Sequence, residues 1–267
     1  MTAATEFAPA KINLALHVIG QQADGYHLLD SLVVFADVGD SLSITAADSM
    51  SLTVDGPFAK GVPEDARNLV WKAVEQSGTT ARITLTKNLP HGAGIGGGSS
   101  DAAAALRAVT RPDLALGLGA DVPVCLNSRP QRMQGIGDVL SDVPDCPSFW
   151  MVLVNPKAHV PTVDVFKALA TKVNPAMEPF PSEGDWLAWL AAQRNDLQRA
   201  AMHYAPVIAE ALGALDDALL TRMSGSGSTC FGIYPDRDAA HAAEARIANA
   251  HTDWWIVATR TRGADPS

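Results

Sequence analysis

Apolar residues in the first part of the chain fall in short runs rich in Val, Ile and Leu, interrupted by Gly and Asp as is typical of β-strands. This pattern predicts strands over residues 11–20, 27–47 and 81–87. The spacing becomes helical over residues 65–78, where a glycine is expected to stop the helix. A glycine-rich segment follows the third strand and leads at once into an alanine-rich helix, which Pro112 is expected to end.

A second pattern begins near Phe149 with a short, fully apolar run. It predicts strands over residues 149–156, 229–235 and 253–262, and helices over residues 162–170, 185–205, 207–220 and 236–250. Two prolines flank a polar turn just before this second part. We therefore expect two domains of mixed helices and strands, residues 1–147 and residues 148–267.

The composition limits the class of protein. Hydrophobic residues make up 47% of the 267, enough for a substantial core, and no apolar run approaches membrane-spanning length. The net charge of −9 argues against a nucleic-acid partner, which favours a basic face. The N-terminal sequence lacks the order of a secretory signal. Three distant cysteines show neither metal-ligand spacing nor a disulfide framework, so we expect reduced thiols in a cytoplasmic protein.

The segment GAGIGGGSSDAAAAL, from Gly92 to Leu106, is the first candidate for chemistry. A glycine-rich loop before a helix suits phosphate, because glycine lets an anion approach the backbone and the helix start offers unpaired N–H groups. A flexible surface loop is the alternative. The spacing also fits the dinucleotide fingerprint, but NLPHG separates it from the preceding strand, and no Gly-Lys-Ser/Thr closes it as in a P-loop. The hydroxyls of Ser99 and Ser100 are left as candidates to meet phosphate or Mg²⁺.

Three other features are ambiguous when each is taken alone. Lys11 stands in an apolar strand, where it is either paired or reaches water at an edge. Asp121 lies between small and apolar residues, either as a functional carboxylate or as the cap of a turn or helix. The segment MSGSGSTCFG, which starts at Met223, is either a second functional glycine-rich turn or a tight hairpin before a strand.

Taken together, PAKINL, LPHGAGIGGGSSDAA and MSGSGSTCFG resemble, in this order, the three motifs of the GHMP kinase superfamily. The stretches DGYHLL and GADVPVCL resemble in particular the members that phosphorylate 4-diphosphocytidyl-2-C-methyl-D-erythritol. The resemblance implies a two-domain α+β fold, with a ribosomal-protein-S5-like N-terminal domain and a ferredoxin-like C-terminal domain. It also implies transfer of the ATP γ-phosphate to the 2-hydroxyl of that small-molecule substrate, in the cytoplasmic non-mevalonate route to isoprenoid precursors.

The resemblance also assigns roles around ATP. Asp121 is expected to be the general base that takes the acceptor proton, and Lys11 to keep it ionised and to neutralise charge on the transferred group. Lys87 is expected near the nucleotide, and Asn68 either there or as a helix cap. Mg²⁺ is expected with ATP, and its protein ligands are left open apart from the candidate hydroxyls of Ser99 and Ser100. The loop expected to wrap the phosphates consists of Pro90, His91, Gly92, Ala93, Gly94, Ile95, Gly96, Gly97, Gly98, Ser99 and Ser100.

A different surface is expected to recognise the cytidine. Tyr26 matches the family position of a ring that stacks on cytosine, and His27 that of a histidine bonded to the base edge, although the residues alone favour a surface turn. Phe166 is expected to supply a second ring, and Asn13 to contact the methylerythritol part. The connection between the loop helix and Asp121 is shorter than the family usually has. Another GHMP kinase, a nicotinamide-dependent oxidoreductase and a silent nucleotide-binding protein are the rival interpretations.

Overall fold

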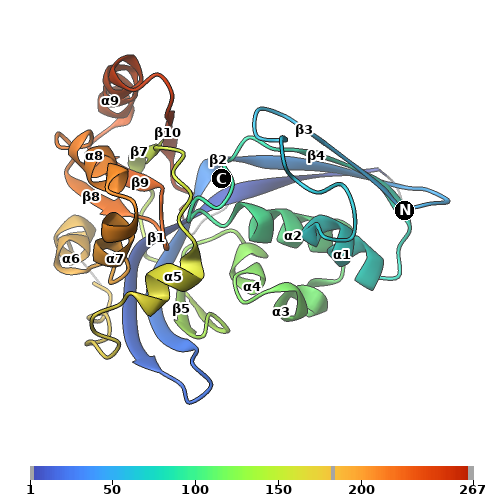
Figure 1. The fold of residues 1–267 in the computed structure, drawn as a ribbon, viewed down its shortest axis with the longest axis horizontal. Coiled ribbons are helices and arrows are strands. Elements are labelled where there is room, and N and C mark those ends of the chain that lie inside the picture. The colour runs from blue at the N-terminus through green and yellow to red at the C-terminus, as the bar shows by residue number, and fades with distance from the viewer. Residues whose placement is uncertain (1–2, 182–183, 264–267) are drawn as a thin grey trace. The chain divides into compact units, whose positions relative to one another are not determined.

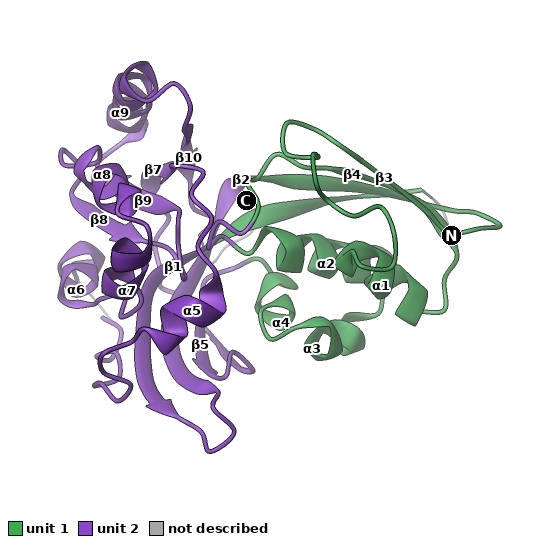
Figure 2. Cartoon of the chain, in the orientation of Figure 1, with its two compact units in different colours: residues 1–11, 38–91, 96–128 green, residues 12–37, 92–95, 129–267 purple. Residues whose placement is uncertain are grey.

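The computed structural model describes residues 3–181 and 184–263 (Figure 1). The chain forms two compact units that alternate along the sequence (Figure 2). Unit 1 holds residues up to 11, 38–91 and 96–128, whereas unit 2 holds residues 12–37, 92–95 and those from 129 onward. Residues 1–147 therefore contain parts of both units, and the predicted domain boundary between residues 147 and 148 stays a prediction.

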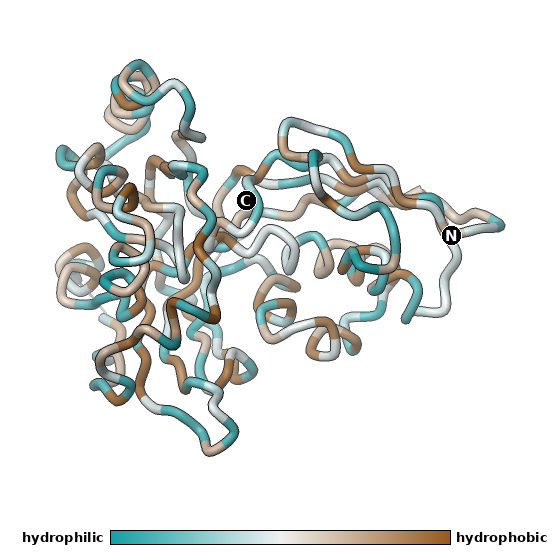
Figure 3. Tube along the Cα trace, in the orientation of Figure 1, coloured by the Kyte–Doolittle hydropathy of each residue, from teal (hydrophilic) through white to brown (hydrophobic). Residues whose placement is uncertain are grey.

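Two long strands, β1 (Ala4–Gln21) and β2 (His27–Ala46), pair with each other, and each contributes residues to both units. Both strands were predicted, the first with shorter bounds. The turn that joins them is hydrophilic (Figure 3). Every residue from Ala8 to Val18 of β1 is buried, which explains why apolar residues dominate this strand.

Unit 1 places helices along one side of a small sheet (Figure 1). The end of β2 pairs antiparallel with β4 (Ala81–Thr86), and β3 (Ser51–Asp55), which the pattern missed, pairs parallel with β4. The helices of this unit are α1 (Leu69–Gln76), α2 (Gly97–Ala108), the 3₁₀ helix η1 (Pro112–Leu114), α3 (Ala115–Leu118) and α4 (Val122–Cys125). Helix α2 ends at Ala108, four residues before Pro112, which instead begins η1, where a proline loses no hydrogen bond.

Unit 2 contains two sets of strands. The start of β2 pairs with β5 (Gln131–Gly135), and β5 pairs with β6 (Val139–Asp142). A separate antiparallel sheet has the order β10–β7–β9–β8. Its strands are β7 (Trp150–Asn155), β8 (Leu220–Met223), β9 (Cys230–Tyr234) and β10 (Trp255–Arg260), and the helices of the unit are α5 (Thr162–Lys167), α6 (Trp186–Ala192), α7 (Gln198–Tyr204), α8 (Val207–Gly213) and α9 (Arg237–Ala250). Numbered along the chain, the order is 4-1-3-2, which is the expected ferredoxin-like arrangement.

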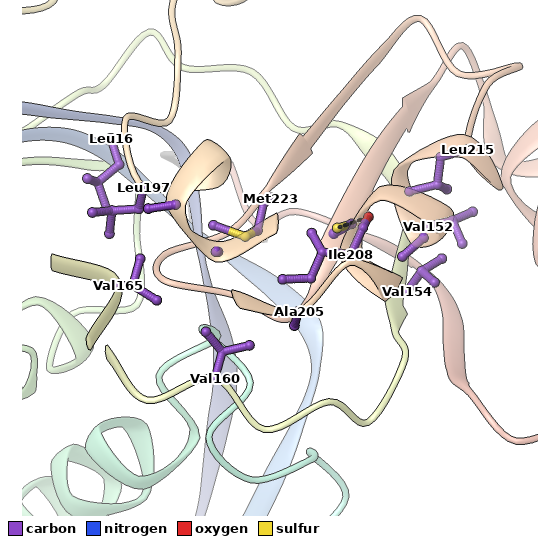
Figure 4. Close-up of a cluster of buried hydrophobic side chains, with 14 of the residues drawn as sticks. Leu16, Val152, Val154, Val160, Val165, Leu197, Ala205, Ile208, Leu215 and Met223 are labelled. Carbon is purple, nitrogen blue, oxygen red and sulfur yellow. Dashed lines mark hydrogen bonds between the residues drawn. The ribbon is translucent and has the colours of Figure 1, made fainter. Parts of the chain in front are cut away.

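The core of unit 2 lies between this sheet and its helices. Val152 and Val154 of β7 pack in one cluster with Ile208 of α8 and Met223 of β8 (Figure 4). Every residue of β9 is buried, as is all of β7 apart from Trp150. Such two-sided burial explains the uninterrupted apolar runs that predicted these two strands.

The single helix predicted over residues 185–205 is wrong, because α6 ends at Ala192 and α7 begins at Gln198. The Arg222 guanidinium donates to the carbonyl oxygens of Leu190 (2.9 Å) and Gln193 (2.8 Å), which a continuous helix would use internally. The Asn195 side chain then accepts from the N–H of Leu197 at 2.9 Å. The pattern also predicted longer bounds for α5 and α8, and it missed β5, β6 and β8.

The three cysteines are unpaired and buried, as expected. Burial raises the pKa of Cys125 and of Cys146 to about 12 each, so both thiols stay protonated near neutrality. None of the helices in residues 3–181 and 184–263 combines the length and apolar character needed to cross a bilayer.

Candidate active site

Lys11 and Asp121 form an ion pair within unit 1, although 110 residues separate them in sequence. The Lys11 Nζ lies 2.8 Å from the Asp121 Oδ2, and the Lys11 side chain is only 5% exposed, so its amine does not reach water at a strand edge. Asp121 stands before α4, but its side chain makes no capping hydrogen bond and is 44% exposed. The geometry therefore favours the functional interpretation of both residues, a carboxylate that a ligand can reach and that a buried cation holds in place.

The glycine loop passes this pair where α2 begins. Gly96, the N-cap residue of α2, has a left-handed φ of 64° that an L side chain rarely adopts. A Cβ on Gly96 would lie 2.9 Å from the Cβ of Lys11, so the approach itself requires glycine. Because Gly96 has no side chain with which to cap α2, the first N–H groups of the helix remain suited to an anion.

The middle of the loop, residues 92–95, belongs to unit 2 and packs against the second glycine-rich turn. The hydroxyl of Ser224 donates to the carbonyl of Gly94 at 2.9 Å, and the N–H of Thr229 donates to the carbonyl of Ala93 at 3.1 Å. A Cβ on Gly94 would lie 2.5 Å from the Ser224 carbonyl oxygen. Residues 224–229 therefore connect β8 to β9 as a hairpin, as one interpretation predicted, and also support the first loop, while a functional role of this turn stays a prediction.

Other predicted loop residues differ in how free their side chains are. The Ser100 hydroxyl is fully buried and donates to the Pro9 carbonyl at 2.8 Å, whereas Ser99 is partly exposed and Gly98 is exposed. Pro90 and Ile95 are buried. The exposed His91 packs its ring edge-on against Phe58, with centroids 6.4 Å apart. Of the two predicted serine hydroxyls, Ser99 is therefore the better placed to meet a phosphate.

Asn68 acts as the N-cap of α1. Its Oδ1 accepts from the N–H of Val70 at 2.9 Å, and its Nδ2 donates to the Pro63 carbonyl at 2.8 Å. The cap interpretation is confirmed, and a contact between Asn68 and the nucleotide stays a prediction.

Lys87 lies below the start of α2, with its ammonium between two carboxylates. Its Nζ is 2.6 Å from the Asp101 Oδ2 and also bonds the Asp40 Oδ2. Burial alone would lower the pKa of Lys87, but the two neighbouring carboxylates raise it, so the ammonium stays charged. Burial raises the pKa of Asp101 to about 8 against the opposing effect of Lys87, because one cation serves two buried acids.

Asn13 lies in β1 within unit 2, buried beside the second glycine-rich turn. Its backbone N–H donates to the Ser224 hydroxyl at 3.1 Å, and its Nδ2 donates to the Ser31 hydroxyl at 2.8 Å. Its Oδ1 is buried without a hydrogen-bond partner among the described residues. Buried polar atoms are rarely left unpaired, so this oxygen is a candidate ligand contact.

His27 and Phe166 stack on each other in unit 2, with ring centroids 4.9 Å apart and ring planes 28° apart. The His27 Nε2 is buried and has no partner among the residues that the structure describes. Burial lowers the pKa of His27, and Lys172 lowers it further, so the imidazole is neutral near pH 7. Tyr26, the residue before His27, is 64% exposed and ends the turn between β1 and β2, where its N–H donates to the Asp24 Oδ1 at 3.1 Å. The expected surface turn is therefore present, and the contact of Tyr26 with a base stays a prediction.

Within unit 1 the structure thus groups Lys11, Asp121 and Gly96, and within unit 2 it groups His27 with Phe166. Sequence reasoning missed the acidic partners of Lys87 and the support that Ser224 gives to the first loop. Asp101 had a visible signal, since it directly follows the two serines of the loop motif. Asp40 had none, because 47 residues separate it from Lys87.

Comparisons with known proteins identify the family. Residues 67–127 match the family described as GHMP kinases N terminal domain, and residues 180–253 match GHMP kinases C terminal. The fold and the paired Lys11 and Asp121 beside a glycine loop thus define a small-molecule kinase of the GHMP class. A homoserine kinase structure from Cytophaga hutchinsonii, with a TM-score of 0.69 at 15% identity and covering 98% of this chain and 95% of its own, shows the shared fold alone.

Relatives of higher sequence identity identify one family within this class. Proteins named 4-diphosphocytidyl-2-C-methyl-D-erythritol kinase from Jannaschia sp. (strain CCS1) and Dinoroseobacter shibae are 53% and 51% identical, over 96% of this chain and 98% and 94% of their own lengths. A crystal structure of 4-(cytidine 5'-diphospho)-2C-methyl-D-erythritol kinase matches with a TM-score of 0.79 at 32% identity, covering 97% of this chain and all of that one. The chain belongs to the family of 4-diphosphocytidyl-2-C-methyl-D-erythritol kinases. The predicted ATP-dependent small-molecule kinase is confirmed, against the oxidoreductase interpretation.

Proposed function

We propose that this chain transfers the γ-phosphoryl group of ATP to the 2-hydroxyl of 4-diphosphocytidyl-2-C-methyl-D-erythritol, releasing ADP. The observation that carries the proposal is the ion pair of Lys11 with the half-exposed Asp121, 2.8 Å apart, next to the Gly96 turn. Family membership supports the substrate. The resemblance to the pathway enzymes supports a cytoplasmic reaction.

Asp121 acts as the general base. It accepts the proton of the acceptor hydroxyl as that oxygen forms its bond to the γ-phosphorus and the bond to the ADP oxygen breaks. Lys11 holds the carboxylate in place through their ion pair, and its ammonium offsets negative charge on the transferred group. The burial of Lys11 supports this role, because a buried ammonium stays beside Asp121 instead of turning toward solvent.

The glycine loop and the start of α2 hold the phosphates. The uncapped N–H groups after Gly96 and the hydroxyl of Ser99 supply donors without intervening side chains. Mg²⁺ normally keeps several waters and takes most other ligands from nucleotide phosphates, with one or two from protein. The described residues contain no group of three His, Cys, Asp or Glu side chains suited to a metal. Mg²⁺ would arrive with ATP and would neutralise phosphate charge, and the partly exposed Ser99 hydroxyl is the protein group that could contact it.

The cytidine is recognised in unit 2. His27 offers its unpaired Nε2 to the edge of cytosine, and Tyr26 and Phe166 supply aromatic faces. The unpaired Oδ1 of Asn13 accepts from a hydroxyl of the methylerythritol part. The His27 and Asn13 assignments are supported by buried atoms without partners among the described residues, and those of Tyr26 and Phe166 by the resemblance to the family.

An acceptor panel tests the proposal. ADP formation is measured with ATP and Mg²⁺ in the presence of 4-diphosphocytidyl-2-C-methyl-D-erythritol, mevalonate or homoserine, with Asp121→Asn as the inactive control. We expect turnover only with the cytidine acceptor. Equal turnover with mevalonate or homoserine, or none with the cytidine acceptor, would falsify the proposal.

A further inference from the structure

Three buried ionic side chains in unit 1, the Asp40–Lys87–Asp101 cluster, have no step in the proposed reaction. Asp40 lies in β2, Lys87 directly follows β4, and Asp101 lies in α2. Their side chains are 0%, 5% and 4% exposed. The Lys87 ammonium bonds both carboxylates, so three separate elements meet at one buried cation.

The cluster holds both ends of the glycine loop. The Asp40 Oδ1 accepts from the backbone N–H groups of Asn88 (2.5 Å) and Leu89 (2.9 Å), where the chain enters the loop. Asp101 belongs to the helix by which the chain leaves the loop. A Cβ on Gly97 would lie 3.5 Å from the Lys87 Nζ and 3.7 Å from the Asp40 Oδ2, so the cluster sits directly under the first turn of α2.

Stability alone does not account for Asp101. Buried ion pairs are often no more stabilising than well-packed apolar side chains, and Asp101 is a second buried acid beside a cation that Asp40 already pairs. The Asp101 Oδ1 is buried without a hydrogen-bond partner among the described residues, which is a further cost. Asp40 by itself would neutralise Lys87. What Asp101 adds is a connection from Lys87 to α2.

We propose that Asp101 is a positioning residue, which with Lys87 and Asp40 fixes the spacing between the two ends of the phosphate loop before ATP arrives. This inference rests on the proposed phosphate role of the loop. A loop whose ends are held in place loses less conformational freedom on binding, so the cluster favours ATP affinity. Lys87 acts through the loop, with its ammonium already occupied by two carboxylates.

Steady-state kinetics of Asp101→Ala test the inference. We expect the KM for ATP to rise about tenfold, because loop ordering is then left to the binding step, while kcat and the acceptor KM stay within about twofold. Asp101→Asn keeps an oxygen that accepts from Lys87, so it restores most of the ATP KM. The matched control is Glu6→Ala, which removes the carboxylate 2.9 Å from Arg107 near the other end of α2 and should leave the ATP KM unchanged.

Amide hydrogen exchange without nucleotide gives a readout that does not depend on the reaction. Exchange at Asn88 and Leu89 should be faster in Asp101→Ala than in the wild type. An unchanged ATP KM, unchanged exchange at these amides, or an equal KM rise in Glu6→Ala overturns the inference. If Asp101→Ala does not fold, Asp101→Ser, too short to reach the ammonium, takes its place with the same expectations. A wild type that does not phosphorylate the cytidine acceptor refutes the proposed function, and the exchange experiment still decides the positioning role.

Discussion

Replacing His27 by Phe should weaken the preference of this chain for cytidine over uridine. His27 is stacked on Phe166 at 4.9 Å, and a phenyl ring can keep this stacking. The change removes the Nε2, which is buried and has no protein partner among the described residues. Burial lowers the pKa of His27, so the ring is neutral at pH 7 and offers one donor and one acceptor.

The expected loss of cytidine preference follows from the hydrogen bond to the base that His27→Phe removes. Cytosine presents an exocyclic amine and a ring-nitrogen acceptor, whereas uracil presents a carbonyl and a ring N–H, so one imidazole tautomer suits one base and mispairs with the other. A buried polar group without its partner costs about 1–3 kcal/mol. At a factor of ten for each 1.4 kcal/mol, His27→Phe should therefore lower the cytidine-to-uridine ratio of kcat/KM roughly 5- to 150-fold.

The assay measures kcat/KM for the diphosphocytidyl acceptor and its uridine analogue in the wild type and in His27→Phe. His241→Phe, on the partly exposed face of α9, is the control for replacing a histidine by Phe in unit 2. The control should keep the wild-type ratio. A ratio that is the same in His27→Phe and in the wild type would refute the assignment of His27 to the base edge.

Three other outcomes can be measured directly. Asp121→Asn should lower kcat about 10²- to 10⁴-fold while calorimetry shows both substrates still bound, and Lys11→Ala should add little to that loss, whereas multiplying losses would separate their roles. Gly96→Val should raise the ATP dissociation constant with the fold retained by circular dichroism, because its Cβ meets Lys11 at 2.9 Å, whereas Gly117→Ala, which meets nothing within 4 Å, should not. Burial lowers the pKa of His17 below 6.5, so the stability contributed by its neutral ring is present above pH 6.5 and is lost as the pH falls below that value. Between pH 6.5 and more acidic pH, urea unfolding should therefore show a smaller loss of unfolding free energy in His17→Gln than in the wild type. Equal losses in the two proteins would contradict this.

The sequence predicted those parts of the fold whose reasons are local. The runs that became β7 and β9 are apolar throughout because both faces are buried, and α9 follows from its composition and the Asp236 cap, whose side chain accepts from the N–H of Ala239. The break between α6 and α7 has no local reason. It depends on Arg222, whose guanidinium reaches carbonyls 29 and 32 residues away in sequence. A helical pattern cannot reveal such a partner, so tertiary contacts overrode it.

The site residues also divide into those that the sequence signals and those that only long-range contacts reveal. Motif order and spacing were enough to predict the glycine loop and to pair Lys11 with Asp121, because the resemblance supplied the long-range relation. No motif linked Lys87 to Asp40, and spacing gave no reason to separate Ser99 from Ser100. The structure distinguishes the two serines by burial, since Ser100 spends its hydroxyl on the Pro9 carbonyl. The sequence indicated which chemistry was present, and only the packing could indicate which polar atoms were free to perform it.

Unit 1 contains two buried lysines whose carboxylate partners differ in exposure, and this exposure decides which ion pair can take part in the reaction. Lys11 and Lys87 have side chains equally buried, at 5% exposed, and each bonds a carboxylate within 2.8 Å. The partner of Lys11 is 44% exposed, whereas the Asp101 side chain is 4% exposed and that of Asp40 is fully buried. A base must exchange its proton with a ligand, so only the first pair can take part in chemistry. The second can act only by holding backbone and helix in place, which is why removing Asp101 should change the ATP KM and removing Asp121 should change kcat.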